Sequence, residues 1–436
     1  MINVYTYTLG CRLNQCESEG IMDAFLSNGF GKAADGRSAD LVIVNTCTVT
    51  SKAEQKARRM IRLFSETAKV VLVTGCYAEM EADEILKLSD KVVIFDMAQK
   101  ASILELPGYI REGMRNGETV EHLVRSFRKV DTDPFRFDAS HFAYHSRAYL
   151  KIQDGCDNHC GYCRTSIARG RSVSLEKEEV VRRALKLEEE GFHEIMLTGV
   201  NLTMYNHENG GLGELCEMLL AALGPDMRIR FSSMEADHID DRLLECIRDP
   251  RIQPHFHLPI QSASDKVLAI CERKYQISKI AYVIDTIRSY RDDPFFACDI
   301  ITGLPGEMEE DFQMTYDFLE KYDLAAVHVF PYSPRVGTAL YKTKEHHVEE
   351  RIRDERAAIL RNLSEKHQRR YISRQEGKDV EILVEEDRNG VFHGTTGNYL
   401  KAAIDWKGEG AIKPGDLLKG RFTKLSPLTV ECDWKA

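Results

Sequence analysis

Long apolar runs are absent from this sequence of 436 residues. No stretch approaches the roughly 18 consecutive apolar residues that a membrane-spanning helix needs, so we expect no membrane partner. Residues 1–15 also lack a basic segment followed by an apolar one, and we therefore expect no secretory signal. Both absences predict a cytoplasmic protein. In that reducing compartment the twelve cysteines are expected to bind metal or take part in catalysis.

An excess of basic charge is missing too, because the formal net charge is −10. Any nucleic-acid-binding surface must therefore be a local patch rather than a property of the whole chain. Internal repeats and low-complexity tracts are absent, which excludes a solenoid. With 43% hydrophobic and 29% charged residues, the composition is that of a globular protein. The length predicts two or three domains.

The N-terminal hundred residues alternate short apolar runs with amphipathic segments. Such an alternation of β-branched runs and helices is typical of a parallel α/β sheet. We therefore predict an N-terminal α/β domain over residues 1–120 and a polar linker within residues 101–146. The four predicted strands are VYTYTLG, DLVIVNT, KVVLVTG and KVVIFD.

A second α/β series begins near Ala148 and contains six further predicted strands. Six consecutive βα units predict a partial (βα)6 barrel over residues 142–372, whose active site would lie at the carboxyl ends of the strands. After Gly377 the sequence changes to short strands and turns, which predicts a small β-barrel over residues 373–436. The six strands are AYLKIQD, EIMLTGVN, RIRFSSME, HFHLPIQ, FACDIITGLP and AVHVFPYS.

Three cysteines follow the first strand of the predicted barrel at C-x3-C-x2-C spacing, namely Cys156, Cys160 and Cys163. Thiolates are the usual ligands of iron–sulfur clusters. Three of them on one loop would hold three irons of a four-iron cluster and leave the fourth open. An open iron is what is needed to chelate S-adenosylmethionine and pass it one electron, after which the cofactor does the radical chemistry.

The alternative at this triplet is a zinc site or an accidental spacing. Structural zinc normally has four ligands and paired C-x2-C spacing. His159 lies next to Cys160 and is poorly placed to complete the same tetrahedron. The cluster is therefore the favoured interpretation. With Tyr162 before its last cysteine, the triplet resembles the radical S-adenosylmethionine superfamily, in which the residue at this aromatic position contacts the adenine.

Three N-terminal cysteines share one structural position although they are far apart in sequence. Cys11, Cys47 and Cys76 each lie at or just beyond the end of a predicted strand. The carboxyl ends of parallel strands meet at one edge of a sheet, where ligands bind, so the three thiols are expected to converge there. The alternative is three separate buried thiols, since free cysteine is often buried. Three equivalent strand ends favour a second cluster.

Taken together, the two cysteine sets resemble those of the radical S-adenosylmethionine methylthiotransferase family, and the resemblance covers nearly the whole chain. It implies two [4Fe-4S] clusters, S-adenosylmethionine, and replacement of C–H by C–S–CH3. It also implies that the C-terminal segment is an RNA-binding β-barrel called the TRAM domain. The motifs that carry it are TLGCRLNQCESE, NTCTVTSKAEQKARRMIR, TGCYAE, GCDNHCGYC, LTGVN, HLPIQSASDKVL, ERKY, DIITGLPGE and HVFPYSPRVGT.

Within this family, GCRLNQ and NTCTVTSKA most resemble the branch that acts on N6-threonylcarbamoyladenosine at position 37 of transfer RNA. Two other branches act on isopentenyladenosine in transfer RNA and on a ribosomal-protein aspartate, and both stay open as alternatives. The resemblance implies that the partners are the tRNA anticodon loop and an external electron donor, with the enzyme acting as a monomer. A non-catalytic Fe–S or zinc RNA-binding protein is the alternative of another class; it would need a fourth ligand at each site.

Polar residues end several strands of the predicted barrel, where such a fold would hold S-adenosylmethionine. Each of them also has an ordinary role in capping or hydrogen bonding as its alternative. Arg273 in ERKY would pair with the methionine carboxylate, since a guanidinium matches a carboxylate bidentately; a surface ion pair explains it equally well. With Tyr162 and Arg273, the candidate cofactor-binding residues are Thr198, Gly199, Asn201, Ser233, Glu235 and Gln261.

Some residues depart from the family pattern. Arg164, Thr165 and Ser166 stand where members usually carry a hydrophobic pair and a proline, and Ala263 replaces a glycine. None of these departures affects a predicted cluster ligand, although Arg164 and Thr165 lie beside the triplet.

Basic residues gather in residues 342–374, which hold ten Lys/Arg and six Asp/Glu. A positive helical surface on an acidic protein would suit phosphate contact, although a solvated face with ion pairs explains the same residues. Residues 370–436 are neutral in charge. RNA binding there would need a patterned face, with Lys419, Arg421 and Lys424 as basic candidates. Phe392, Tyr399 and Phe422 are candidates for base stacking or for the barrel core.

Overall fold

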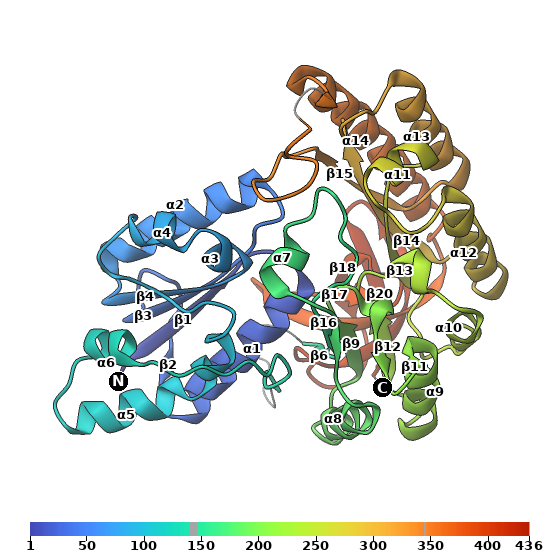
Figure 1. Cartoon of the computed structure of the whole chain (residues 1–436). Coiled ribbons are helices and arrows are strands. Elements are labelled where there is room, and N and C mark those ends of the chain that lie inside the picture. The colour runs from blue at the N-terminus through green and yellow to red at the C-terminus, as the bar shows by residue number, and fades with distance from the viewer. Residues whose placement is uncertain (139–145, 344–345, 436) are drawn as a thin grey trace. The chain divides into compact units, whose positions relative to one another are not determined.

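The computed structural model of the chain describes residues 1–138, 146–343 and 346–435. The chain folds into two compact units. The first comprises residues 1–144 together with the short segments 154–157 and 163–173, and the second comprises the rest. Each unit is described by itself below, with the element labels of Figure 1. Among the described helices, none is both long enough and apolar enough to cross a membrane.

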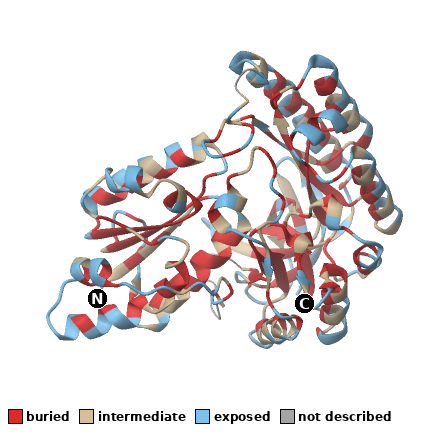
Figure 2. Cartoon of the chain, in the orientation of Figure 1, coloured by how far each residue is buried: buried red, intermediate tan, exposed pale blue. Residues whose placement is uncertain are grey.

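The first unit is built on a five-stranded parallel sheet of order β2-β1-β3-β4-β5. Every residue of β3 and β4 is buried, which explains why both strands read as continuous β-branched runs (Figure 2). All four strands expected from the sequence are present, and β2 is an additional short one. The strands are β1 (Asn3–Thr8), β2 (Gly31–Lys32), β3 (Leu41–Thr46), β4 (Val70–Gly75) and β5 (Val92–Ile94).

Helices connect and cover these strands. Helix α2 begins at Thr50, whose side-chain oxygen accepts a hydrogen bond from the backbone N–H of Ala53 (3.1 Å), as expected of an N-cap. The helices of this unit are α1 (Arg12–Ser27), α2 (Ser51–Thr67), α3 (Cys76–Met80), α4 (Ala82–Leu86), η1 (Lys100–Leu104), α5 (Leu106–Arg115), α6 (Val120–Ser126) and α7 (Thr165–Arg169).

The expectation of a linker within residues 101–146 is wrong for residues 101–126, whereas residues 127–138 contain no helix or strand. Residues 101–126 contain the end of η1 and the helices α5 and α6. Ile103, Ile110 and Leu123 from these elements pack into the same hydrophobic core as strand residues of the sheet. Their apolar side chains recur at helical spacing, and the polar residues between them belong to the solvent face. The remainder, residues 139–145, lies outside the described residues.

The second unit contains the six parallel strands expected from the sequence (Figure 1). They form two three-stranded sheets of order β12-β9-β6 and β13-β14-β15. Two isolated parallel bridges, Ile229 to Ile252 and Ser233 to His257, join the segments of the two sheets. The predicted partial barrel is thereby confirmed. Its strands are β6 (Ala148–Lys151), β9 (Glu194–Thr198), β12 (Arg228–Phe231), β13 (His255–Gln261), β14 (Phe295–Thr302) and β15 (Ala326–Pro331).

Helices and short elements connect these strands. They are β7 (Gln153–Asp154), β8 (Val173–Ser174), α8 (Lys177–Glu189), η2 (Leu202–Met204), β10 (Asn206–His207), β11 (Gly210–Gly211), α9 (Leu212–Ala222), η3 (Ala236–His238), α10 (Asp241–Cys246), α11 (Asp265–Ile270), α12 (Ile277–Tyr290), α13 (Glu309–Tyr322) and α14 (Glu350–Ser373). Helix α14 is the charged helix expected before the C-terminal strands, and it packs against β15.

The C-terminal strands close into a barrel of order β16-β17-β18-β20-β19, which confirms the predicted small β-barrel. The core of this C-terminal barrel also includes Phe295 of β14 and Tyr371 of α14. The C-terminal barrel therefore shares its apolar core with the two joined three-stranded sheets, which we call the six-stranded sheet. Its strands are β16 (Asp379–Arg388), β17 (Val391–Thr396), β18 (Lys401–Trp406), β19 (Leu417–Leu425) and β20 (Leu428–Lys435).

Candidate active site

The three N-terminal cysteines lie at the carboxyl ends of adjacent parallel strands in the first unit. Cys11 follows β1 and precedes α1, Cys47 directly follows β3, and Cys76 directly follows β4. Gly10 brings the first loop against the second: a Cβ on this residue, whose φ is +103°, would lie 2.6 Å from the Cβ of Cys47. Only glycine allows this approach. The strand-end position inferred from the sequence therefore brings the loops together.

The three thiols could serve as ligands of a metal site, since thiolates are the usual ligands of iron–sulfur clusters. Burial raises the pKa of Cys47 to about 12, and the neighbouring Cys11 adds to this effect. Within the described residues, no three Cys, His, Asp or Glu side chains lie close enough to hold one metal ion. A zinc ion draws every ligand to within about 2.3 Å of one centre, whereas the irons of a cluster take separate thiolates. Three such thiols could each bind one iron of a four-iron cluster.

A buried charge network lies beneath these cysteine loops, and sequence reasoning missed it. The guanidinium of Arg169 donates to carboxylate oxygens of Glu17 and Asp154, at 3.0 Å each, and to the side-chain oxygen of Asn14 at 2.8 Å. Lys100 contacts Glu17 as well. Asn14 in turn donates to the backbone oxygens of Leu9 (2.8 Å) and Thr46 (3.1 Å). The network thus fixes the backbone just before Cys11 and Cys47.

Arg164 occupies a position where the resembled family usually has an apolar residue, and the structure gives it partners. Its guanidinium lies 3.2 Å from Glu54 and 2.6 Å from Glu81. It also donates to the hydroxyl of Thr48 at 3.3 Å. The charge is buried but compensated on both sides, as a buried ion must be. This departure from the family pattern therefore serves the packing of the first unit.

The central cysteine loop is divided between the two units. Cys156 and Cys163 belong to the first unit, in which the N–H of Cys156 donates to the oxygen of Gly170 (3.0 Å) and the N–H of Thr165 donates to the Sγ of Cys163 (3.3 Å). In the second unit, the N–H of Gly161 donates to the oxygen of Cys271 at 3.0 Å. Backbone hydrogen bonds therefore hold both flanks of the loop.

Arg273 is the centre of a buried polar group in the second unit. It donates to the Sγ of Cys160 and to the hydroxyl of Tyr162, both at 3.3 Å, and it forms an ion pair with Glu235. Tyr275 accepts a further hydrogen bond at 2.8 Å. Three candidates from the sequence, Tyr162, Glu235 and Arg273, are therefore gathered beside a predicted cluster ligand. In this structure the partner of Arg273 is Glu235, not a surface carboxylate.

The candidates after β9 show features that suit a polar ligand. Thr198 and Asn201 are buried, and the Oγ1 of Thr198 and the Nδ2 of Asn201 have no hydrogen-bond partner among the described residues. Buried polar atoms are normally paired, so orphans of this kind point to an absent partner. A Cβ on Gly199 would lie 2.7 Å from the side-chain oxygen of Gln153, which also accepts from the N–H of Asn201 (2.9 Å).

Gln261 and Ser233 take different roles. Gln261 ends β13 with a φ of +68°, a left-handed conformation that is uncommon for a residue with a side chain. Such strain is found preferentially at functional sites. The hydroxyl of Ser233 forms a 2.7 Å hydrogen bond with the Nδ1 of His257. His257 was not a candidate from the sequence, and the register of β13 shifts between Leu258 and Gln261, so simple alternation does not relate the two side chains.

The aromatic candidates of the C-terminal barrel lie mostly inside the protein. Phe422 is 2% exposed and belongs to the barrel core. The ring of Tyr399 lies over that of His255, with 4.1 Å between centroids. Phe392 packs against the same core as Phe422. The core alternative is therefore the better description of Phe422 and Phe392, and Tyr399 packs on the six-stranded sheet.

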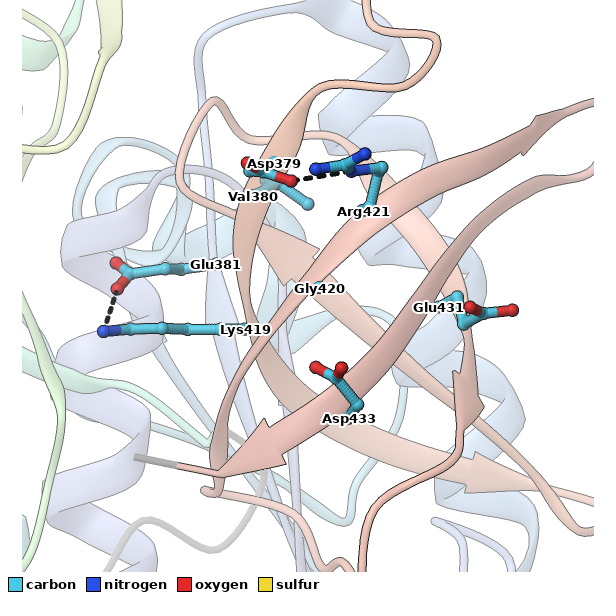
Figure 3. Close-up of a pocket in the computed structure, with 8 residues that line it drawn as sticks. All are labelled: Asp379, Val380, Glu381, Lys419, Gly420, Arg421, Glu431 and Asp433. Carbon is cyan, nitrogen blue, oxygen red and sulfur yellow. Dashed lines mark hydrogen bonds and ion pairs between the residues drawn. The ribbon is translucent and has the colours of Figure 1, made fainter.

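Two of the three basic candidates on this barrel are neutralised by carboxylates. Arg421 lies 2.8 Å from Asp379, and Lys419 lies 3.6 Å from Glu381. Both pairs border a hollow of about 670 Å³ that Glu431 and Asp433 also line (Figure 3). Four carboxylates against two cations make this hollow acidic, so it does not suit phosphate groups.

The basic residues of α14 and its C-cap residue Arg374 are largely paired as well. Arg370 and Arg374 lie within 3.0 Å of Asp323, and Arg351 lies 2.8 Å from Glu355, four residues further along the helix. The interpretation of this segment as a face with ion pairs therefore accounts for these side chains. Residues 344 and 345, which contributed to the charge count, lie outside the described residues.

Two family models match separate segments of this chain. Residues 3–96 match the family model described as uncharacterized protein family UPF0004, and residues 150–319 match that of the radical SAM superfamily. A threonylcarbamoyladenosine tRNA methylthiotransferase, MtaB, from Treponema pallidum is 36% identical, with 97% of this chain and 98% of that protein covered. The enzyme of the same name from Bacillus subtilis is 33% identical, with 93% and 90% covered.

A related enzyme of Thermotoga petrophila, a tRNA-2-methylthio-N(6)-dimethylallyladenosine synthase, is 31% identical, with 89% of this chain and 88% of that protein covered. Among solved structures, the radical S-adenosylmethionine methyltransferase TsrM of Kitasatospora setae has a TM-score of 0.52 at 14% identity, with 76% of this chain and 74% of that chain covered. That likeness concerns the fold alone. The full-length similarity to curated enzymes, on a chain with both cysteine sets, shows that this protein belongs to the radical S-adenosylmethionine methylthiotransferase family.

Proposed function

We propose that the protein methylthiolates C2 of N6-threonylcarbamoyladenosine at position 37 of transfer RNA. The observation that carries this proposal is similarity over nearly the whole chain to enzymes named for that reaction, one of which is 36% identical. Both halves of the required chemistry have candidate residues in the chain: three thiols at adjacent strand ends in one unit, and a C-x3-C-x2-C loop after the first strand of a partial barrel.

The proposed ligands follow from this division. Cys156, Cys160 and Cys163 would hold the cluster that binds S-adenosylmethionine, and Cys11, Cys47 and Cys76 would hold the auxiliary cluster. When bound, these groups supply a 5′-deoxyadenosyl radical and the sulfur that is transferred, with methyl from a second S-adenosylmethionine. The target base must leave its stack to reach a radical inside a barrel.

The chain's own residues would orient the cofactor and keep water out. Tyr162 lies on the cysteine loop, where it would contact the adenine. Arg273 and Glu235 would act as a paired unit, because each satisfies the buried charge of the other. Thr198 and Asn201 would offer their unpartnered polar atoms to the ligand. Gly199, Ser233 and Gln261, also at strand ends, complete the proposed cofactor-binding set.

Two other substrates belong to the same chemistry. The dimethylallyladenosine enzymes are also similar to this chain over most of its length, but at 31% identity against 36% for the first MtaB relative. A protein aspartate is the second alternative. We place the domains at residues 1–120, 142–372 and 373–436, and we propose the tRNA anticodon loop and an external electron donor as partners of a monomer. Because its proposed substrate is tRNA, we propose that the enzyme acts in the cytoplasm.

Nucleoside mass spectrometry tests the proposal directly. Transfer RNA from cells that lack the gene should contain N6-threonylcarbamoyladenosine without its 2-methylthio derivative, and the gene should restore the derivative. Restoration of only the 2-methylthio form of isopentenyladenosine would overturn the choice of substrate. Anaerobic reconstitution followed by detection of 5′-deoxyadenosine separates the enzyme from a non-catalytic Fe–S or zinc protein, which would release none.

A further inference from the structure

One face of the six-stranded sheet, which we call the inner face, carries Arg230, His255 and Asp299. Its polar side chains lie at successive levels along the strands. Toward the amino ends of the strands, this face is covered by the C-terminal barrel: Arg230 donates to the oxygen of Gly397 at 2.9 Å, and His255 lies against Tyr399. Toward the carboxyl ends lie Glu235 and Arg273, next to Cys160.

Between these two layers, four strand segments place one polar residue each on the inner face. Strand pairing puts Asp299 of β14 directly beside His328 of β15, and Ser233 beside His257 of β13. The Nε2 of His257 lies 3.1 Å from the Oδ1 of Asp299, and its Nδ1 is hydrogen-bonded to Ser233 at 2.7 Å. The imidazole rings of His257 and His328 meet edge to face at 5.6 Å. We call these four residues the histidine row.

The histidine row ends in open surface rather than in packing. Along β15 the burial alternates, so that Val327 and Val329 are buried while His328 and Phe330 are exposed. Phe330 is 39% exposed. These two exposed rings suit a ligand. The imidazole of His328 offers polar nitrogen atoms, and the ring of Phe330 offers a flat apolar surface.

A metal ion does not explain the row. No three of its side chains form a group that could hold one, within the part of the chain that the structure describes. Partial burial lowers the pKa of His328, and the neighbouring His257 lowers it further, although Asp299 opposes both. A neutral imidazole carries one donor and one acceptor. The row therefore presents a carboxylate acceptor and an imidazole that both donates and accepts, a set that matches an amide or urea group.

We propose that the histidine row is the subsite for the N6 substituent of the target base and that His328 is its specificity-determining residue. This inference rests on the proposed function and deepens it. A threonylcarbamoyl substituent has N–H donors and a carbonyl acceptor, which Asp299 and His328 would satisfy. A dimethylallyl substituent has neither, so it would offer no hydrogen-bond partner to Asp299 or His328, and sites built to hydrogen-bond a substrate discriminate strongly against such analogues.

The proposal predicts a binding difference that needs no turnover. Reconstituted wild-type enzyme should bind tRNA that carries N6-threonylcarbamoyladenosine at position 37 about tenfold more tightly than the same tRNA with adenosine there, the effect of one or two hydrogen bonds. His328→Leu, which keeps the bulk but loses the polar edge, should reduce this ratio to about one. His328→Gln, which keeps a donor and an acceptor, should retain part of it.

His122→Leu is the matched control, because His122 is a surface residue of α6. It should leave the ratio at the wild-type value. An unchanged ratio in His328→Leu, or a wild-type ratio of one, would overturn the inference. A different result would refute the proposed function itself: the wild-type enzyme would form no 2-methylthio product on the threonylcarbamoyl tRNA. If the enzyme forms the product but its binding ratio does not depend on His328, the proposed function stands and only the assignment of the subsite is refuted.

Discussion

The guanidinium carbon of Arg230 lies 5.0 Å from the ring centroid of Tyr399, and this contact joins the six-stranded sheet to the C-terminal barrel. Arg230 is fully buried. It also forms a bidentate pair with Glu194, at 2.7 and 3.0 Å, and donates to the backbone oxygen of Thr396 at 3.2 Å. The barrel thus supplies partners for a charge inside the sheet, which an independently folding module would not do.

Replacement of Tyr399 by alanine should therefore destabilise the second unit. The change removes the ring that lies against His255 and over the guanidinium groups of Arg230 and Arg147. Aromatic and cation–π contacts of this kind contribute about 1 kcal/mol each, so we expect the loss of these three contacts to lower the free energy of unfolding by about 3 kcal/mol. Chemical denaturation measures it.

Tyr399→Phe is the control for this prediction, since it keeps the ring and should lose much less stability. Deletion of residues 377–436 should lower the melting temperature of the remaining chain, because Phe295 and Tyr371 would lose their apolar partners. A truncated protein that melts at the wild-type temperature would contradict the shared core and support a separately folding barrel.

The sequence predicted the strands and the strand-end cysteines because both depend on local patterns. The buried runs LVIVNT and VVLVTG identify β3 and β4, and Cys47 and Cys76 follow them directly. The charge network was not predictable in this way. Lys100 and Arg169 reach Glu17 across 83 and 152 residues of sequence, respectively, and only the folded chain shows which carboxylate each one meets.

The histidine row was missed for a related reason. Its members lie on four strand segments, and their proximity depends on the pairing of β13, β14 and β15 rather than on spacing along the chain. The prediction of a linker was wrong for a different reason. Its helices α5 and α6 are short and their exposed faces are polar, so composition hid apolar side chains such as Ile110 and Leu123 that complete the core.

Replacement of Arg169 by glutamine should strongly destabilise the first unit. Its guanidinium is 1% exposed and pairs with both Glu17 and Asp154. Removal of one partner from a buried network leaves uncompensated charge, which costs about 3–5 kcal/mol. Arg171→Gln is the matched control, because the side chain of Arg171 is 92% exposed. Equal effects on the free energy of unfolding from the two changes would contradict the role of the network.

Iron analysis tests the two cysteine sets. The reconstituted wild type should hold about eight irons per chain, as two four-iron clusters require. Replacement of Cys11, Cys47 and Cys76 by alanine should halve this number and abolish methylthio transfer, while some 5′-deoxyadenosine is still formed. The corresponding change at Cys156, Cys160 and Cys163 should also halve the iron but abolish 5′-deoxyadenosine.

Cys16→Ala serves as the control for both triple variants. Cys16 is buried in α1 and follows no strand, so its loss should leave the iron content at the wild-type value. A wild-type protein with only about four irons, or a central triple variant that still cleaves S-adenosylmethionine, would refute the assignment of two separate clusters.

Replacement of Trp434 by alanine should weaken tRNA binding without affecting the fold. Trp434 lies on β20 of the C-terminal barrel and is 48% exposed, and the Nζ of Lys419 lies 4.5 Å from its ring centroid. An exposed ring suits a base of a single-stranded loop, and stacking on such a ring is worth about 1–3 kcal/mol. We expect an affinity loss of about tenfold, measured by titration with unlabelled tRNA.

Trp434→Phe should retain most of the affinity, because the ring remains. The dependence of affinity on salt should stay the same in both variants, since neither removes a charge that contacts phosphate. Trp406 is the contrasting aromatic: its Nε1 donates to the oxygen of Gly410 at 2.9 Å and its ring packs against the barrel core, so its replacement should lower stability instead. Wild-type affinity in Trp434→Ala would exclude this ring from the tRNA interface.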